Sequence, residues 1–323
     1  LVPGAGDRLG LADTFGHFHL SAISSDGCEL VPAWSFELQY CEAGGSPLPV
    51  NRAVLCFEFL RGPWEVVFSQ QLGERIMFCR LPMDEGQKTS QVFQFAFHSA
   101  PITCFRTNAA RTTLVSASSD GTLKMTETSG GALLDHVRNA MTAVPTALAF
   151  LGPVMVACGS SDGVVSLWDV SANRLVPSQR LAVSPMAITS IAGFVPQELL
   201  SQWSPARAST DQLDVGLIGT PPQPPWMVTE TSAGKAPVML AAGTAHGVTH
   251  VWSPNPKDDF DWALKFSLCE GVVGPAVGLT FSPCGSFLAS ITGSSPLWVA
   301  CAAACAKFHP AMLPTVMQHF ACN

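Results

Sequence analysis

The pattern Gly-x-Ser-x-Gly at residues 159–163 is the chain's strongest candidate for a catalytic nucleophile. In hydrolases this pattern places a serine, here Ser161, on a sharp turn between a strand and a helix. The residues that follow, VVSLWDV (164–170), alternate as a strand does, and the same SSDG tetrapeptide recurs at 24–27 and 118–121. Because a motif needs its structural setting, the sequence favours a structural turn over a catalytic serine.

A glycine-rich stretch, GAGDRLG at residues 4–10, is similar in composition to a dinucleotide-binding loop. Its last glycine lies one residue too far along the chain, no full strand precedes it and no βαβ pattern follows. We interpret the stretch as a flexible terminus, and the sequence predicts no cofactor.

Cys301, Cys305 and His309 are spaced four residues apart, so an unbroken helix would place them on one face. Zinc prefers such ligands. The residues between them are mostly alanine, cysteine packs readily as a small hydrophobic residue, and Pro310 would end the helix. Buried thiols are therefore the favoured interpretation.

Three aspartates, Asp258, Asp259 and Asp261, form an acidic cluster flanked by Lys257 and Lys265. No glycine-containing loop with regular ligand spacing follows, as a calcium site would require. The cluster is interpreted as a solvated loop, and the sequence predicts no metal site and no catalytic residue.

The elements that position these residues are hairpins. Residues 114–127 and 155–170 each contain an apolar strand, an Asp-Gly turn and a second alternating strand, which is a hairpin signature. Weaker copies lie at 239–253, 66–80 and 281–300. The turn glycines are Gly27, Gly73, Gly121, Gly163 and Gly247, separated by 46, 48, 42 and 84 residues. A repeat length in the low-to-mid forties, with several short strands in each repeat, is typical of β-propeller blades.

Two segments carry a family resemblance. VACGSSDGVVSLWDV (156–170), ending in Trp168-Asp169, resembles a WD repeat, and VGLTFSPCGSFLAS (277–290) looks like that family's first two strands. His98 is similar to the histidine of the Gly-His pair that begins a blade, although Phe97 replaces the glycine. The resemblance implies that a turn aspartate, a Ser or Thr two residues before it, a tryptophan and this histidine form a buried hydrogen-bonded chain. Such a network fixes one geometry.

The predicted motif residues are structural rather than catalytic, and no blade has the full set. Thr126 replaces the tryptophan of one blade, and another lacks the histidine because His136 lies too early. The predicted set is His98, Ser118, Asp120, Ser160, Asp162, Trp168, Asp26, Trp252 and Trp298.

The predicted fold class is all-β, a WD-repeat-like β-propeller over residues 1–303. Six units can be placed, at 15–45, 50–85, 98–130, 143–180, 186–256 and 272–303. Residues 195–238 are either an inserted loop, as their prolines favour, or a degenerate seventh blade, as the 84-residue step favours; seven blades is our prediction. Residues 304–323 are expected to form a short helical tail, and the ring is expected to close by pairing N-terminal with C-terminal strands, since an open edge would be exposed.

Composition excludes several classes. The charged fraction is 13%, about half of the roughly 25% usual in soluble domains. A net charge of −7 without any basic run argues against nucleic acid as the primary partner, and the apolar stretches are too short to span a bilayer. Eleven scattered cysteines without a CxxC pair indicate reduced thiols. We therefore expect an intracellular reducing compartment, the cytoplasm in the first place, with an organelle left open.

The predicted function is a protein–protein interaction scaffold, a subunit of a larger assembly whose other proteins cover part of this weakly charged surface. The alternative is a ubiquitin-ligase substrate receptor or a peptide reader. The former often carries Trp-Asp-x-Arg, but Ser171 follows Trp168-Asp169-Val170, and the few Arg and Lys residues are dispersed in the sequence. Residues 221–226, PPQPPW, are either loop or a polyproline segment for a partner's aromatic groove.

Overall fold

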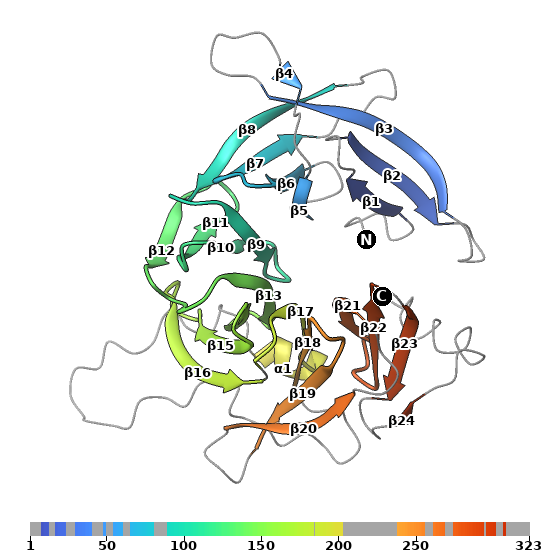
Figure 1. Ribbon diagram of the computed structural model, residues 1–323. Coiled ribbons are helices and arrows are strands. Elements are labelled where there is room, and N and C mark those ends of the chain that lie inside the picture. The colour runs from blue at the N-terminus through green and yellow to red at the C-terminus, as the bar shows by residue number, and fades with distance from the viewer. Residues whose placement is uncertain are drawn as a thin grey trace, which may run out of the picture. The chain divides into compact units, whose positions relative to one another are not determined.

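Antiparallel strands make up nearly all of the computed structural model (Figure 1). The structure describes residues 8–12, 17–23, 30–40, 48–49, 54–60, 65–80, 89–183, 185–202, 238–255, 261–268, 274–293, 295–301 and 306–307. These contain 24 strands and one short helix, α1 (Gln197–Gln202). The described part of the chain has no helix long and apolar enough to cross a membrane.

The chain divides into two compact units, residues 1–145 and 146–323. The first contains an eight-stranded sheet and a four-stranded sheet. The strands of the eight-stranded sheet are β1 (Arg8–Ala12), β2 (His17–Ile23), β3 (Leu30–Tyr40), β4 (Leu48–Pro49), β5 (Val54–Phe59), β6 (Glu65–Gln70), β7 (Arg75–Arg80) and β8 (Thr89–Phe97). The four-stranded sheet is β9 (Ile102–Thr107), β10 (Thr113–Ser118), β11 (Leu123–Glu127) and β12 (Leu133–Val137).

The first two repeats are joined in one sheet, unlike the separate units that the sequence predicts. Strands β5 to β8 form an antiparallel meander, and so do β1 to β3. Residues 37–40 of β3 then pair in parallel with residues 89–92 of β8. Glu37 pairs with His17 of β2 and with Thr89 of β8, so β8 pairs with the edge of β3 opposite to β2.

The second unit contains three four-stranded meanders. Their strands are β13 (Pro145–Leu151), β14 (Met155–Ser160), β15 (Val164–Asp169) and β16 (Val176–Ala182); β17 (Ile188–Phe194), β18 (Met239–Thr244), β19 (Thr249–Pro254) and β20 (Trp262–Leu268); and β21 (Ala276–Phe281), β22 (Phe287–Thr292), β23 (Ser295–Cys301) and β24 (Ala306–Lys307). All five predicted hairpins are therefore present.

The seventh blade remains a prediction. The described residues supply six groups of strands, and β17 pairs directly with β18 although they lie far apart in the sequence. The intervening chain is thus an excursion between the first and second strands of one sheet, and it begins with α1. Its remainder, residues 203–237, lies outside the described residues, together with the polyproline segment 221–226.

The predicted ends of the repeats are too early. Strands β8, β12 and β20 lie wholly beyond the ends predicted for their units, at 85, 130 and 256. In the tail, Ala306–Lys307 pairs with β23 as strand β24 where a helix is predicted; the unpaired edge of β23 supplies the hydrogen-bonding partners. Residues 308–323 lie outside the described part, and ring closure stays a prediction.

In the sheets β9–β12, β13–β16 and β17–β20, the fourth strand is less buried than the second. Every residue of β14 and β18 is buried, whereas β12 and β16 are mostly exposed or half-buried. A strand covered on both faces is apolar or small throughout, so it shows no alternation and carries no charge. This accounts for part of the low charge of the chain.

Small residues in the second strands allow neighbouring sheets to approach closely. A Cβ atom on Gly159 of β14 would lie 2.5 Å from Cγ2 of Ile188 on β17. Threonines at a 43-residue spacing add polar links: Oγ1 of Thr146 donates to the carbonyl of Ile188, and Oγ1 of Thr189 donates to that of Ala276 at 2.7 Å. The threonines that recur at this spacing are thus residues that contact the next sheet.

Candidate functional site

The buried motif network of the β9–β12 sheet centres on His98. Its side chain is 3% exposed, and Nε2 lies 2.7 Å from Oγ of Ser116 on β10. The backbone N–H of His98 donates to the carbonyl of Glu74, in the turn between β6 and β7. The histidine thus links the start of one repeat to the turn of the preceding one.

Asp120 and Ser118 lie in the turn that follows β10. The Asp120 carboxylate accepts hydrogen bonds from the backbone N–H of Thr122 and from Oγ of Ser99, both at 2.9 Å. Burial alone would raise the pKa of Asp120, but the hydrogen bonds from Thr122, Ser99 and Ser118 outweigh it and lower this pKa to about 2. Ser118 also donates to the carbonyl of Ala100 at 3.0 Å. Both residues therefore hold the turn in place.

Ser116 is the network residue that the sequence interpretation missed. The resemblance assigns the serine two positions before the aspartate, Ser118, whereas the serine bonded to His98 stands four positions before it. Side chains two residues apart on a strand share a face, so both serines satisfied the pattern. The signal that separates them is register: Ser116 pairs with Phe105 in the middle of β9, whereas Ser118 pairs with Ile102 at its start.

The next repeat keeps fewer of these contacts. Ser160 Oγ donates to the Asp162 carboxylate at 2.5 Å and lies 2.9 Å from the carbonyl of Val164. Cys158 stands four positions before the aspartate, where the preceding repeat has Ser116, and the buried Nε1 of Trp168 has no hydrogen-bond partner. The residues that flank Gly159–Gly163 are strands β14 and β15. The structural turn is confirmed.

The histidine position of this repeat is occupied by Met141. The N–H of Met141 donates to the carbonyl of Gly121, as that of His98 donates to the carbonyl of Glu74. Val183 makes the equivalent bond to Gly163 in the following repeat. Only one of the three positions is therefore histidine; the other two hold apolar residues, of which Met141 is buried and Val183 is half-buried.

The remaining predicted residues lie elsewhere. Trp252 on β19 is 4% exposed and packs against the ring of His250, with centroids 5.8 Å apart. Trp298 belongs to β23, opposite Ser290. Asp26 lies outside the described residues.

The pKa of His98 gives the site a pH dependence. Burial, with a smaller contribution from Lys124, lowers this pKa to about 4, although the charge of Asp120 acts in the opposite direction. The unfolded chain, with an ordinary histidine pKa of about 6.5, binds more protons between the two values. The free energy of unfolding should therefore be highest above pH 6.5 and fall by about 2 kcal/mol between pH 7.5 and 5 on this account.

Urea unfolding of His98→Gln at pH 7.5 and pH 5 measures how much His98 contributes to the pH dependence of the free energy of unfolding. Glutamine remains neutral and can still bond Ser116, so the variant should lose about 2 kcal/mol less than the wild type over that interval. A control, His246→Gln in the exposed turn between β18 and β19, should follow the wild-type curve. Equal losses in His98→Gln and wild type would contradict the assignment.

The described cysteines differ sharply in accessibility. Burial raises the pKa of Cys56 to about 11 and that of Cys104 to about 12. Cys284 is exposed; slight burial would raise its pKa, but hydrogen bonds from Ser282 and Ser286 outweigh this and lower it. Because the thiolate is the reactive form, Cys284 should be alkylated at least about tenfold faster than the other two.

Pulse labelling with iodoacetamide at pH 7.5, followed by peptide mass spectrometry, resolves the three sites. The Cys284→Ser variant should lose the fast-labelled peptide and leave the slow ones unchanged. Labelling of Cys104 as fast as Cys284 would show that the sheets open far more readily than their burial implies.

No group of three or more His, Cys, Asp or Glu side chains within the described ranges is arranged to hold a metal ion. Cys305 and His309 of the predicted cysteine cluster, and Asp258 and Asp259 of the acidic cluster, lie outside these ranges. Those two interpretations therefore remain predictions.

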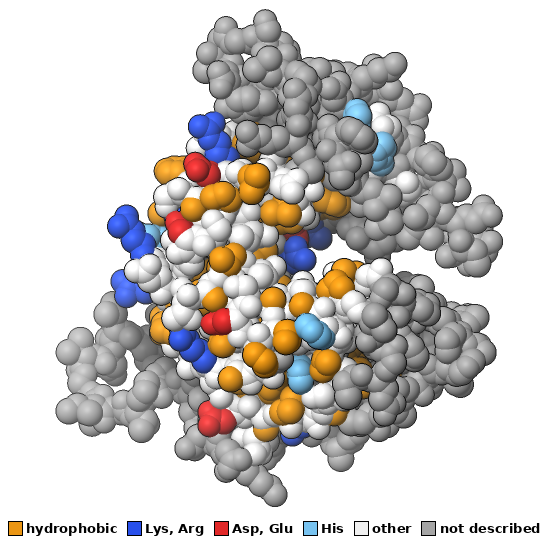
Figure 2. Space-filling model, in the orientation of Figure 1, with side chains coloured by type: hydrophobic (Ala, Val, Ile, Leu, Met, Phe, Trp, Pro, Cys, Tyr) orange, Lys and Arg blue, Asp and Glu red, His pale blue; other side chains and the backbone are white. Residues whose placement is uncertain are grey.

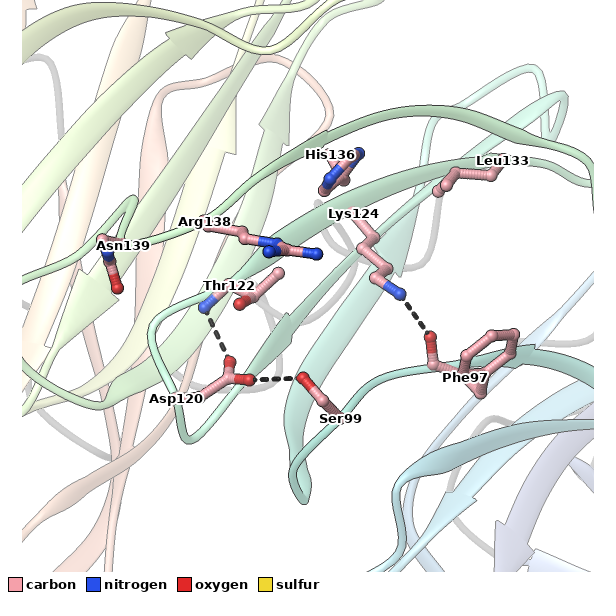
Figure 3. A pocket seen from close by; sticks show the side chains of 9 residues that line it. All are labelled: Phe97, Ser99, Asp120, Thr122, Lys124, Leu133, His136, Arg138 and Asn139. Atoms are coloured by element: carbon pink, nitrogen blue, oxygen red, sulfur yellow. Dashed lines mark hydrogen bonds between the residues drawn. The ribbon is translucent and has the colours of Figure 1, made fainter.

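Beside the motif turn, an open pocket of about 570 Å³ lies over β11 and β12 (Figure 3). Lys124, Arg138 and His136 bring basic groups to it, and Phe97 and Leu133 bring apolar ones. Asp120, Ser99, Thr122 and Asn139 complete the lining. Residues that the sequence interpretation treats as dispersed are thus gathered by the pairing of two strands.

Residues 89–126 match the sequence model of the family described as WD40: WD domain, G-beta repeat. The match begins with β8 and includes His98, Ser116 and Asp120. A comparison with curated proteins gives no match. Among solved structures, the crystal structure of Sqt1 from Saccharomyces cerevisiae is similar, with a TM-score of 0.58 and 13% identity, over 94% of this chain and 70% of that one. At this identity the similarity concerns the fold alone.

Proposed function

We propose that this chain, a WD-repeat protein with the sheet architecture of a β-propeller, is a non-catalytic interaction scaffold and a subunit of a larger multiprotein assembly. The WD-repeat family and the all-β fold class predicted from the sequence are confirmed. Proteins with this fold typically bind other proteins and are not catalytic, so a general role in protein interaction follows. Membership of a stable assembly and the absence of any catalytic activity belong to the proposal.

The observation that carries the proposal is a surface with exposed hydrophobic side chains and few charges. Within the described residues, nine large hydrophobic side chains are exposed: Leu55, Leu72, Phe97, Leu133, Val144, Val176, Leu264, Val277 and Ile291. The face drawn in Figure 2 shows hydrophobic side chains reaching the surface among sparse charged ones. Single exposed residues are ordinary, but together with a charged fraction of 13% they support a surface that other proteins cover.

The motif side chains support the non-catalytic part. His98 is 3% exposed and bonds Ser116 on β10, and Ser160 is 1% exposed and donates to the Asp162 carboxylate. A general base or nucleophile needs a geometry that leaves it open to a substrate. These residues instead stabilise the hairpins.

Purification of the affinity-tagged chain from cells that naturally produce it tests the proposal. We expect co-purifying proteins at constant stoichiometry and a mass by light scattering well above the 34.1 kDa of the chain. A lone, stable, monodisperse monomer without co-purifying proteins would contradict membership of an assembly.

The peptide-reader alternative is favoured by one observation, the basic and apolar pocket beside the motif turn. The ubiquitin-ligase form of the alternative has no such support: the position after Trp168-Asp169-Val170 is Ser171, whose N–H donates to the Asp169 carboxylate at 2.8 Å.

A further inference from the structure

We infer that the pocket over β11 and β12 binds an acidic segment of a partner protein, in which an Asp or Glu carboxylate lies next to an aliphatic or aromatic side chain. This inference rests on the proposed interaction function and names the chemistry of one partner. It differs from the sequence interpretation, in which scattered Lys and Arg residues argue against a reader of anionic peptides.

Strand register brings the basic residues together. Lys124 on β11 lies directly opposite His136 on β12, so the two side chains share a face. Arg138 lies in the turn one residue beyond the end of β12, and its side chain lines the same pocket. In Figure 3 the guanidinium of Arg138 points toward the side of the pocket where Lys124 lies.

A register shift adds an apolar residue to this face. Met125 pairs with Asp135, but Thr126 then pairs with Leu133 instead of Leu134. The extra residue turns Leu133 to the face of Lys124 and His136, where its side chain is 52% exposed. A bulge commonly re-aims a side chain in this way.

Phe97 forms the opposite wall, at a position where glycine is usual in the family that the sequence resembles. Its ring is 60% exposed. The Nζ of Lys124 lies 4.8 Å from the ring centroid and donates to the Phe97 carbonyl at 2.8 Å. The ammonium is thus held at the pocket wall without a carboxylate partner.

The charges favour an anionic ligand. Among the described residues, the ion pairs join Arg80 to Glu65 and Arg106 to Glu58, so neither Lys124 nor Arg138 takes part in one. The one acid of the pocket, Asp120, already accepts hydrogen bonds from Thr122 and Ser99 on its two oxygens. Two available cations therefore face one carboxylate whose charge is partly compensated.

Size and lining favour a peptide. A volume of about 570 Å³ lies within the range of small-ligand sites, and such sites combine apolar walls with a few placed polar groups. The pocket is open, so it can admit side chains of a continuous segment. A carboxylate of the peptide would contact Arg138 and Lys124, and a neighbouring apolar side chain would lie between Phe97 and Leu133.

The test uses a random dodecapeptide phage library selected on the full chain. We expect the recovered peptides to be enriched in Asp or Glu next to Leu, Ile or Phe. The Kd of a recovered peptide, measured by fluorescence anisotropy, should rise about tenfold in the double variant Lys124→Met, Arg138→Gln, and binding should weaken with added salt. Phe97→Ala should weaken it about threefold, since the apolar wall is lost.

Lys265→Met is the matched control, because Lys265 is an exposed lysine on strand β20, and its Kd should equal that of the wild type. Thermal melting confirms that each variant is folded. Peptides without an excess of acidic residues, basic peptides, or acidic peptides that bind the double variant equally would overturn the inference. So would self-association that the double variant abolishes, since the occupant would then be a second copy of the chain.

Co-purification with the double variant separates this inference from the proposed function. Loss of one partner with retention of the others supports both. Retention of every partner overturns the pocket assignment and leaves the scaffold role standing, whereas a wild-type chain without partners contradicts the scaffold role itself.

Discussion

Replacing Phe105 with alanine should lower the free energy of unfolding by about 3–5 kcal/mol. Phe105 is fully buried on β9, in a cluster with Leu60, Val67, Ile76, Ile102 and Leu114, so its ring packs one sheet against the next. Truncation removes the transfer free energy of the ring and leaves a cavity that the paired strands cannot close. Urea unfolding followed by tryptophan fluorescence measures the loss.

Phe97→Ala is the matched control for this substitution. It removes the same atoms from a ring that is 60% exposed, so the loss should remain below about 1 kcal/mol. Equal losses in the two variants would show that the packing between β9 and the preceding sheet does not limit stability.

Gly121→Ala should cost about 2–4 kcal/mol, the second-largest effect, because two penalties combine. The backbone φ at Gly121 is +76°, a left-handed conformation that a side chain disfavours. A Cβ atom there would also lie 2.7 Å from the carbonyl oxygen of Met141. This oxygen belongs to the backbone of the residue whose N–H donates to Gly121, so relief of the contact breaks the link between successive repeats.

Gly130→Ala in the next turn of the same sheet provides the comparison. An added Cβ at Gly130 meets nothing within 4 Å, so the change in unfolding free energy should be below about 0.5 kcal/mol. Thermal melts of both variants decide the matter; a Gly121→Ala melt superimposable on that of Gly130→Ala would rule out the strain at this turn.

The hairpins were predictable because their information is local. An Asp-Gly or lone Gly turn between two apolar stretches placed β10–β11, β14–β15 and β18–β19 without any knowledge of the rest of the chain. The fourth strands were not predictable in the same way. Strand β12, with the sequence LLDHV, is exposed or half-buried throughout, so its residues carry little of the burial pattern by which a strand is recognised.

His98 and Asp120 do not bond each other, unlike the buried chain that the family resemblance implies. His98 is buried and bonds Ser116, whereas Asp120 lies in an exposed turn and accepts hydrogen bonds from Thr122 and Ser99. The choice between Ser116 and Ser118 depends on how far β9 overlaps β10, which is a property of the paired strands. The parallel joining of β3 to β8 likewise depends on the pairing of strands that lie far apart in the sequence.

The sequence by itself determined the WD-repeat resemblance, the all-β class, the turn positions and the absence of the helical setting that a nucleophilic serine at 159–163 would need. Each of these depends on residues that lie close together in the chain. Tertiary structure alone decided which serine meets His98 and that Lys124, Arg138 and Phe97 line one pocket. These residues come from three different strands or strand ends, and their convergence depends on register, a bulge at Leu133 and the contact between two sheets. Strand pairing joins residues that lie far apart in the sequence, so the residues that line the pocket could not be identified from their spacing.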